Sequence, residues 1–178
     1  MSKEFVVLVN EQDQEIGLEE KLAAHEKALL HRAFSLFVFN SKGEMLIHQR
    51  AANKYHCPNL WTNAVCSHPR QGETLQEALK RRSKEELNLN LVEQPTKLFE
   101  FIYKAKFDNG LTEHEYDHVF AITSDEQPRI VPEEVQDFKY LLPTQIEQEI
   151  EKNPEKFTYW FRKAFPKVIE KWSSLVMK

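Results

Sequence analysis

Apolar runs separated by turn residues fill the start of the chain and predict a β-rich beginning. Residues 5–9 (FVVLV) are continuously apolar, which is typical of a short buried strand. Two further runs, at 33–39 and 45–49, flank the turn sequence NSKG at 40–43 and predict a β-hairpin. Between these features, residues 19–31 have the composition of a helix.

The middle of the chain contains one strongly patterned helix. Residues 51–60 show no regular period and predict a loop, and residues 61–65 predict another strand. From Thr74 to Leu89 the apolar residues recur at helical spacing, and no glycine or proline interrupts them. We therefore expect a helix over 74–89.

The second half of the chain returns to strands and ends in helices. Residues 97–107 and 111–123 are rich in strand-forming residues and surround the turn sequence DNG, so they predict a second hairpin. A further strand is expected at 138–142. Helical patterns follow at 143–151 and 154–172, with Pro154 as the first helical residue of the second.

These elements together predict an α/β (α+β) fold, a mixed β-sheet flanked by α-helices. We find no repeat, low-complexity tract or linker, so we expect one compact domain over 1–178. Its core is expected at about 31–165, with a C-terminal helix to 178. Pro166 is expected to kink or break that helix, because proline removes a backbone donor.

Composition narrows the class of protein. The 178 residues are 41% hydrophobic and carry a net charge of −4 with both signs mixed along the chain, which argues against a nucleic-acid partner. No apolar run approaches the roughly 18 residues of a membrane span, and residues 1–4 lack a signal-peptide pattern. Only two cysteines occur, so we expect a reducing compartment, the cytoplasm, and no membrane association.

Cys66 and His68 form the most conspicuous chemical pair, in the stretch NLWTNAVCSHPRQGE at 59–73. A single Cys-x-His pair does not complete a four-ligand zinc site. A nucleophile would need the imidazole to reach the thiol and a third group to orient it. From the residues alone, a structural cysteine, a metal ligand and a catalytic thiol all remain open.

The segment EHEYDH at 113–118 is unusually polar for a strand. Alternation places Glu113, Glu115 and Asp117 on one face and the histidines and tyrosine on the other. Neighbouring carboxylates repel unless they are solvated, share a proton or hold a cation. A functional role is therefore favoured over a place in an ordinary core.

Other candidates depend on how the fold brings residues together. His25 and His31 are six residues apart, about 120° out of alignment on a regular helix, so spacing alone favours two surface histidines. Arg82 and Glu86 suit a salt-bridged helix face. Five basic residues could gather around an anion, and three aromatic residues could line a pocket: Lys21, Arg50, Lys54, Arg81 and Arg82, with Tyr103, Trp61 and Trp160.

The spacing Glu73-x7-Arg81-x4-Glu86 resembles a modified Nudix box, the loop-helix element of Nudix hydrolases. The chain departs from the hydrolase pattern at Ser67, Arg82, Ser83 and Asn88. The arginine at 82 replaces an acid of the metal-binding cluster, and a cation there opposes a metal and favours an anion. A Nudix diphosphate hydrolase is kept as the alternative function, and a catalytically inactive Nudix-like binding module as a third.

Further motifs make the resemblance more specific. WTNAVCSHP at 61–69, a lysine four residues before His25, and Glu113-His114-Glu115 some 45 residues later resemble the type I isopentenyl-diphosphate isomerases of the Nudix superfamily. The similarity runs from about residue 3 to 165. It implies a Nudix-like fold and interconversion of isopentenyl and dimethylallyl diphosphate in isoprenoid biosynthesis. A proton would be added to the alkene and another removed, through a carbocation-like state.

The resemblance also implies roles for individual residues. Cys66 and Glu115 would carry the proton transfers, with Tyr103 bonded beside Glu115 and Trp160 facing the cation. The diphosphate would be held by Lys21, Arg50, Lys54, Ser67 and Arg82. No role is assigned to Cys57, Glu85, His48, His56, His114 and His118, which are interpreted as structural or surface positions.

Two metal sites follow from the same resemblance. Mn²⁺, Zn²⁺ or Mg²⁺ would be bound by His25, His31, His68, Glu113 and Glu115, a mixed nitrogen and oxygen set. A second ion, Mg²⁺, would bridge Glu86 and the diphosphate. The expected partner is a small allylic or homoallylic diphosphate, and the protein is expected to be a monomer or weak homodimer.

Overall fold

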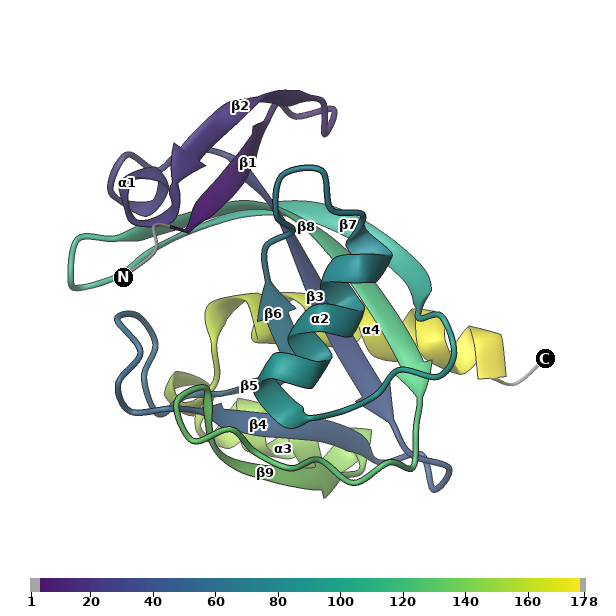
Figure 1. Ribbon diagram of the computed structural model, residues 1–178. Coiled ribbons are helices and arrows are strands. Elements are labelled where there is room, and N and C mark those ends of the chain that lie inside the picture. Colours follow the sequence, from purple (N-terminus) through teal and green to yellow (C-terminus); the bar gives the residue numbers. More distant parts are fainter. Residues whose placement is uncertain (1–3, 177–178) are drawn as a thin grey trace.

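A mixed β-sheet with helices on both faces forms the centre of the fold (Figure 1). The computed structural model describes residues 4–176, and within them nine strands belong to one sheet. In chain order the elements are β1 (Phe5–Val9), β2 (Glu15–Glu20), α1 (Lys21–Glu26), β3 (His31–Phe39), β4 (Met45–Arg50), β5 (Trp61–Asn63), β6 (Val65–Ser67), α2 (Leu75–Leu87), β7 (Thr96–Lys106), β8 (Thr112–Thr123), β9 (Val135–Leu141), α3 (Pro143–Lys152), the 3-10 helix η1 (Pro154–Lys156) and α4 (Tyr159–Val176).

Strand β3 organises the sheet, because it pairs with β1, β4, β6 and β8. Its pairing with β8 is parallel and places His31 opposite Glu115. Strand β7 runs antiparallel to β8 and places Tyr103 on the other side of Glu115. The antiparallel pairing of β6 puts Cys66 opposite Ser35. The register thus brings residues from distant parts of the chain to one region of the sheet.

Two apolar cores lie on the two faces of the sheet. Leu36 of β3 packs in the core that contains Leu79 of α2. Its neighbour Phe37 points the other way, into the core that contains Phe161 of α4. Figure 1 shows the same arrangement, with α2 in front of the sheet and α4 behind it. The mixed sheet and flanking helices predicted from the sequence are confirmed.

Helix α2 has well-formed ends. At its start, Thr74 and Glu77 form a capping box: the backbone N–H of Thr74 donates to the Glu77 carboxylate at 2.8 Å, and the Glu77 N–H donates to the Thr74 hydroxyl at 3.3 Å. At its end Asn88 takes a left-handed conformation with φ 51°, which asparagine tolerates better than most residues. The helix expected over 74–89 is therefore present as Leu75–Leu87, with Thr74 and Asn88 as its caps and Leu89 beyond it.

The expected helix over 19–31 is largely wrong. Only Lys21–Glu26 are helical. Glu19 and Glu20 belong instead to β2 (Glu15–Glu20), which pairs with β1 and whose residues 15–18 were in no predicted element. Ala28 has a φ of 54°, which is incompatible with a continued right-handed helix. His31 instead begins β3, because sheet pairing on both sides of that strand outweighs the local preference for a helix.

Two further expectations need correction. The strand expected at 61–65 is divided into β5 and β6, which pair with different neighbours, β4 and β3. The last helix starts at Tyr159 and continues through Pro166 without a break. Phe165 and Val168, on either side of this proline, are buried, and their packing compensates for the roughly 3 kcal/mol that an interior proline costs.

The boundaries of the expected domain are only partly described. Residues 1–3 and 177–178 of the predicted 1–178 domain lie outside the described residues. Helix α4 can be followed to Val176. Within residues 4–176, no helix combines the length and apolar character that crossing a membrane demands.

Candidate active site

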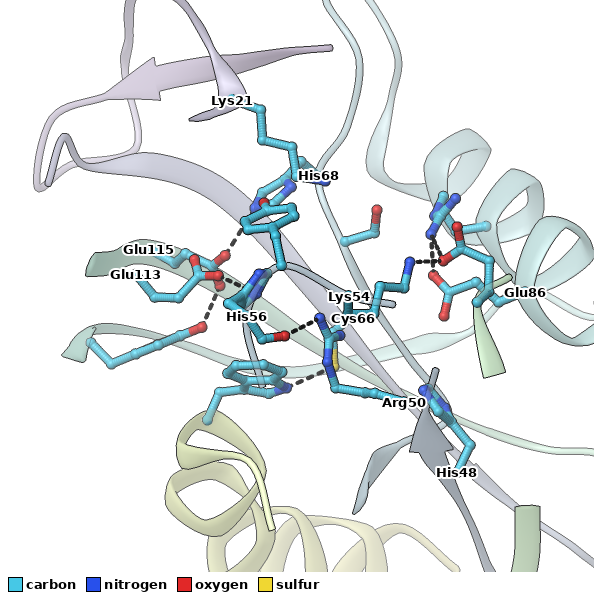
Figure 2. A pocket seen from close by; sticks show the side chains of 16 residues that line it. Lys21, His48, Arg50, Lys54, His56, Cys66, His68, Glu86, Glu113 and Glu115 are labelled. Atoms are coloured by element: carbon cyan, nitrogen blue, oxygen red, sulfur yellow. Dashed lines mark hydrogen bonds and ion pairs between the residues drawn. The ribbon is translucent and has the colours of Figure 1, made fainter. Parts of the chain in front are cut away.

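One cavity of about 70 Å³ receives side chains from most parts of the fold (Figure 2). They come from α1, β4, β6, α2, β7, β8 and α4, and from the loop at 51–60. A wider recess of about 910 Å³ shares Lys21, Lys54, His68 and Arg82 with it. In Figure 2 the carboxylates of Glu113 and Glu115 lie at one side of the view and Glu86 at the other. The cavity therefore has two distinct polar ends.

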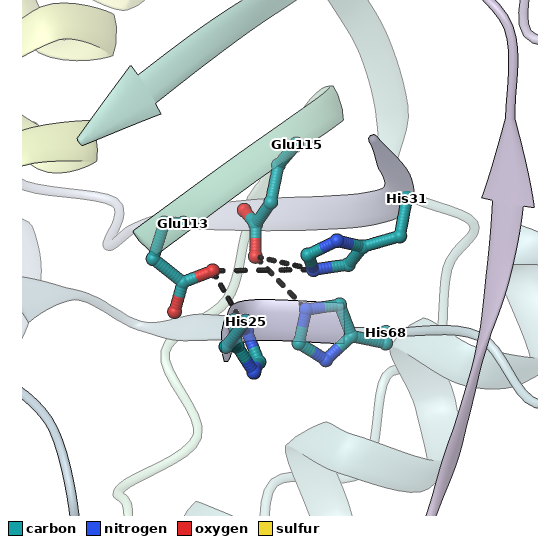
Figure 3. A group of neighbouring side chains, drawn as sticks. All are labelled: His25, His31, His68, Glu113 and Glu115. Carbon is teal, nitrogen blue, oxygen red and sulfur yellow. Dashed lines mark hydrogen bonds and ion pairs between the residues drawn. The ribbon is translucent and has the colours of Figure 1, made fainter. Parts of the chain in front are cut away.

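The first polar end is a His/Glu cluster (Figure 3). Five side chains each offer one ligand atom, and these atoms all lie within 4.8 Å of one another: His25, His31, His68, Glu113 and Glu115. His25 comes from α1, His31 from the start of β3, His68 from just after β6, and the carboxylates from β8. The break in the helix between 26 and 31 is what allows both N-terminal histidines to reach the cluster.

Short contacts connect the carboxylates to the imidazoles. Glu113 Oε2 lies 3.0 Å from His25 Nε2 and 3.9 Å from His31 Nε2. Glu115 Oε1 lies 2.9 Å from His68 Nε2 and 3.6 Å from His31 Nε2. All five residues are buried or nearly buried, and the electrostatic interactions between them are therefore strong.

The donor set fits a divalent cation. The Nδ1–H of His31 donates to the carbonyl of Leu29 at 2.8 Å, which directs Nε2 toward the two carboxylates. That Nε2 atom is buried and has no hydrogen-bond partner, yet it faces both carboxylates. A buried imidazole nitrogen without a hydrogen-bond partner, beside two carboxylates, suits a divalent cation.

Two of the five ligands have the protonation state that a metal needs, whereas in His31 burial would lower the pKa but contacts with Glu115 and Glu113 raise it above its ordinary value. Burial lowers the pKa of His68 to about 4, so this ligand is a neutral imidazole at pH 7. Burial would raise the pKa of Glu113, but hydrogen bonds from His25 and His56 hold it well below its usual range. Metal ligands must be deprotonated, as these two groups are.

Cys66 is held by a hydrogen-bond network. Its thiol donates to Asn63 Oδ1 at 2.8 Å, and the indole N–H of Trp160 donates to its sulfur at 2.9 Å. The same indole N–H also approaches the Thr62 hydroxyl at 3.0 Å. Burial raises the pKa of the Cys66 thiol to about 12, so the group is a neutral thiol near pH 7.

Glu115 and the aromatic residues complete this part of the cavity. The hydroxyl of Tyr103 donates to Glu115 Oε2 at 2.6 Å, a short charge-assisted bond. Trp160 is buried, and the guanidinium of Arg50 lies 5.5 Å from the centroid of its ring. The indole face therefore already lies next to a positive charge, which is the arrangement a cation–π contact needs. Trp61 packs against the apolar core rather than lining the cavity.

The second polar end combines cations with two carboxylates. Arg82 contacts Glu86 at 2.6 Å and Glu134 at 3.0 Å, and Lys54 contacts Glu134 at 2.6 Å. Arg50 uses two donors to hold the 51–60 loop, at the carbonyls of His56 and Cys57. At this end Arg50, Lys54 and Arg82 outnumber Glu86 and Glu134, and this local surplus of cationic groups is suited to an anion.

The structure gathers the residues proposed from the sequence. Those lining the cavity are Lys21, Arg50, Lys54, Cys66, Ser67, His68, Arg82, Glu86, Tyr103, Glu113, Glu115 and Trp160. His25 and His31 join through the His/Glu cluster. Arg81 does not line the cavity but bonds to Glu73 at 2.6 Å, fixing the loop before α2.

Some cavity residues had no role in the sequence interpretation. Glu134 and Tyr55 were not among the candidates from the sequence, and His48 and His56 were interpreted as structural or surface positions. His48 is buried and bonds to the Ala64 carbonyl at 3.1 Å, which fits a structural role. His56 lies 2.7 Å from Glu113. No local pattern marks a loop residue such as His56, since its contact spans 57 positions of the chain.

Comparison with known proteins identifies the family of the chain. The NUDIX domain family matches residues 29–161. The chain is 41% identical to isopentenyl-diphosphate Delta-isomerase 2 of Aromatoleum aromaticum over 164 residues, 92% of this chain and 86% of that protein. It is 45% identical to the isopentenyl-diphosphate Delta-isomerase of Aliivibrio fischeri over 172 residues, 93% of this chain and 95% of that protein.

Solved structures share the same fold. DR0079 of Deinococcus radiodurans superimposes with a TM-score of 0.69 at 26% identity, covering 84% of this chain and 90% of that one. A MutT protein of Methanosarcina mazei superimposes with a TM-score of 0.63 at 17% identity, covering 77% and 91%. With a NUDIX domain over most of its length and relatives above 40% identity over nearly all of it, the chain belongs to the isopentenyl-diphosphate Delta-isomerase family.

Proposed function

We propose that the protein interconverts isopentenyl diphosphate and dimethylallyl diphosphate by adding a proton at one end of the alkene and removing one at the other. The observation that carries this proposal is that a thiol and a carboxylate, Cys66 and Glu115, line one small cavity. Each is bonded to an aromatic donor, Trp160 at 2.9 Å and Tyr103 at 2.6 Å. A diphosphate hydrolase has no evident use for such a pair.

The protonation states of the pair suit a double-bond shift. Burial keeps Cys66 as a thiol. Burial and the charge of Glu113 oppose ionisation of Glu115, but the nearby His31 and the hydrogen bond from His68 lower its pKa below the usual value. The two groups thus begin with one transferable proton between them. A proton can be given by one residue while the other takes a proton from the substrate, so each step has an acid and a base in place.

The alkene demands more than an acid, because it is a very weak base. Positive charge develops on carbon as the proton arrives, and the π-face of Trp160 can stabilise it. The cavity wall around Cys66 is buried, which keeps water from trapping the cationic state. Trp160 therefore has two functions in this proposal, orienting the thiol through its N–H and facing the cation with its ring.

The diphosphate is assigned to the cationic end of the cavity. Lys21, Arg50, Lys54 and Arg82 supply positive charge, and the backbone at Ser67 adds a polar contact. In the free protein Lys54 and Arg82 are paired with Glu134 and Glu86. A diphosphate that arrives with Mg²⁺ would give the cations a new anionic partner and the Glu86 carboxylate a cation to bind.

The His/Glu cluster is assigned to Mn²⁺, Zn²⁺ or Mg²⁺, held by His25, His31, His68, Glu113 and Glu115. A bound ion would compensate the charge of the two carboxylates and fix their orientation. Glu115 would then have one oxygen toward the metal and the other toward Tyr103.

We further infer a cytoplasmic enzyme that acts on a small molecule as a monomer or weak homodimer, without nucleic-acid or membrane partners. Cys57 and Cys66 are both free thiols, which suits a reducing compartment. The mixed surface charge with a net value of −4 supports the absence of a nucleic-acid partner.

Assays with two kinds of substrate distinguish the isomerase from the alternative, a Nudix diphosphate hydrolase. Purified protein is incubated with isopentenyl diphosphate and Mg²⁺, and dimethylallyl diphosphate is measured by chromatography. In parallel, phosphate release from nucleoside diphosphates and their derivatives is measured. We expect isomer formation without phosphate release, whereas phosphate release without isomerisation would favour a Nudix hydrolase.

A further inference from the structure

His56 is a buried histidine that belongs to a loop rather than to the sheet. It lines the cavity from the 51–60 segment and is only 8% exposed. Its Nε2 lies 2.7 Å from Glu113 Oε1, a shorter contact than any the cluster imidazoles make with that carboxylate. Figure 2 shows this ring directed toward Glu113.

The two carboxylates of the cluster, Glu113 and Glu115, have equivalent arrangements of neighbouring groups. Tyr103 occupies Glu115 Oε2, so Glu115 Oε1 is the oxygen that faces His31 and His68. In the same way His56 occupies Glu113 Oε1, so Glu113 Oε2 is the oxygen that faces His25 and His31. Each carboxylate therefore has one oxygen held by a donor outside the cluster and one oxygen available to a cation.

The backbone of the loop is fixed so that His56 has little freedom. Arg50 Nη2 donates to the carbonyl of His56 at 3.2 Å, and Asn109 donates to the carbonyl of Tyr55 at 2.8 Å. The Tyr55 hydroxyl lies 3.5 Å from His25 Nδ1, so the loop contacts the cluster at a second point. The donor to Glu113 is thus preorganised by contacts from two other parts of the chain.

We propose that His56 is a positioning residue that holds Glu113 as a one-oxygen metal ligand and thereby sets the divalent-metal affinity of the His/Glu cluster. The inference rests on the metal site assigned under the proposed function. A ligand carboxylate whose outer oxygen is hydrogen-bonded loses less rotational freedom on binding a cation, and it cannot turn to chelate with both oxygens. Removing the donor leaves Glu113 in place but free to rotate.

The test measures metal binding to the full chain without substrate. Metal is removed by chelation and dialysis, and Mn²⁺ binding is titrated by electron paramagnetic resonance of the free ion. We compare wild type with His56→Ala, with His56→Phe, which keeps a ring but has no donor, and with His56→Gln, which keeps an N–H donor. The control is His118→Gln, because His118 also bonds a carboxylate, Asp13, but lies on the opposite face of β8.

We expect His56→Ala and His56→Phe to bind Mn²⁺ about 10- to 100-fold more weakly than wild type. His56→Gln should recover most of that loss, and His118→Gln should bind as wild type does. The proposal is overturned if His56→Ala or His56→Phe binds with wild-type affinity, if His56→Gln is as weak as His56→Ala, or if wild type binds no Mn²⁺. The binding assay contains no substrate, so its outcome does not depend on isomerase activity, which is measured in a separate experiment.

Discussion

The thiol of Cys66 donates its hydrogen bond to Asn63 Oδ1 at 2.8 Å. The orientation of that amide is not free. Asn63 Nδ2 donates to the carbonyls of Leu36 at 3.1 Å and Val65 at 2.8 Å, so only the amide oxygen can face the sulfur. An acceptor fixed in this way holds the S–H bond in one direction. The proton-carrying group of the proposed reaction is therefore positioned by the sheet itself.

Replacing Asn63 should affect turnover more than substrate binding. Asn63→Ala removes the acceptor for the Cys66 thiol and leaves two buried carbonyls without their donor, which costs about 1–3 kcal/mol each in stability. We expect kcat to fall at least tenfold, with KM changed much less, because Asn63 does not contact the cationic end. Steady-state kinetics measures the two constants, and Asn90→Ala, an exposed asparagine bonded to Glu126, is the control. Equal kcat values for Asn63→Ala and wild type would show that the thiol needs no such acceptor.

Substitution of Cys66 should reduce isomerase activity, whereas substitution of Cys57 should leave it unchanged. Cys66→Ala removes the proposed proton-transfer group, so the rate of isomerisation should fall by roughly 10²–10⁴-fold. Cys57→Ala should retain activity, since the polar contact of Cys57 is made by its backbone carbonyl, with Arg50, and its thiol only packs against the apolar core. Isomer formation is followed for both variants under the same conditions. Full turnover by Cys66→Ala would remove this residue from the mechanism.

Chelation should abolish activity. With the cation removed, the buried carboxylates of Glu113 and Glu115 keep only imidazole, tyrosine and each other as partners, and Glu115 loses the fixed orientation the reaction needs. Activity is measured after dialysis against a strong chelator and after addition of Mn²⁺, Zn²⁺ or Mg²⁺ separately. We expect recovery with at least one of these ions. Undiminished activity in demonstrably metal-free protein would rule out the assigned metal site.

His48 should make the fold sensitive to acid. Burial, with the nearby charge of Arg50, lowers its pKa from 6.5 to about 3. The unfolded chain therefore takes up the proton first as pH falls, so this contribution to stability is complete above pH 6.5 and is lost progressively down to about pH 3. Relative to His48→Gln, the free energy of unfolding of wild type should fall by roughly 1.4 kcal/mol per pH unit over that window. Urea unfolding at several pH values measures the difference. Parallel pH profiles for the two proteins would contradict it.

Local pattern was sufficient for many strands and for helix α2. The runs at 33–39 and 45–49 are apolar because both faces of β3 and β4 are buried, and such runs are visible without any tertiary information. The same reasoning failed at 19–31. There, residues of good helical propensity enter a strand at His31 because β1 and β8 pair with it, and pairing partners cannot be read from a local window.

The site, like the fold, was predictable from local sequence only in part. The polar alternation in EHEYDH revealed that Glu113 and Glu115 share a face, but only the parallel register of β3 and β8 places His31 opposite Glu115. The resemblance to a family supplied most of the remaining cavity residues. His56 and Glu134 belong to irregular segments, where neither period nor motif indicates direction, so their contacts with Glu113 and Arg82 emerged only from the fold.

In the proposed isomerisation, a proton from the protein or solvent is added to an alkene carbon while another proton is removed from the substrate. Incubation of the purified protein with isopentenyl diphosphate in deuterated water with Mg²⁺, followed by mass spectrometry of the product, measures this directly. We predict dimethylallyl diphosphate that carries deuterium on carbon. Product formed without any deuterium, or release of phosphate in place of the isomer, would contradict the account.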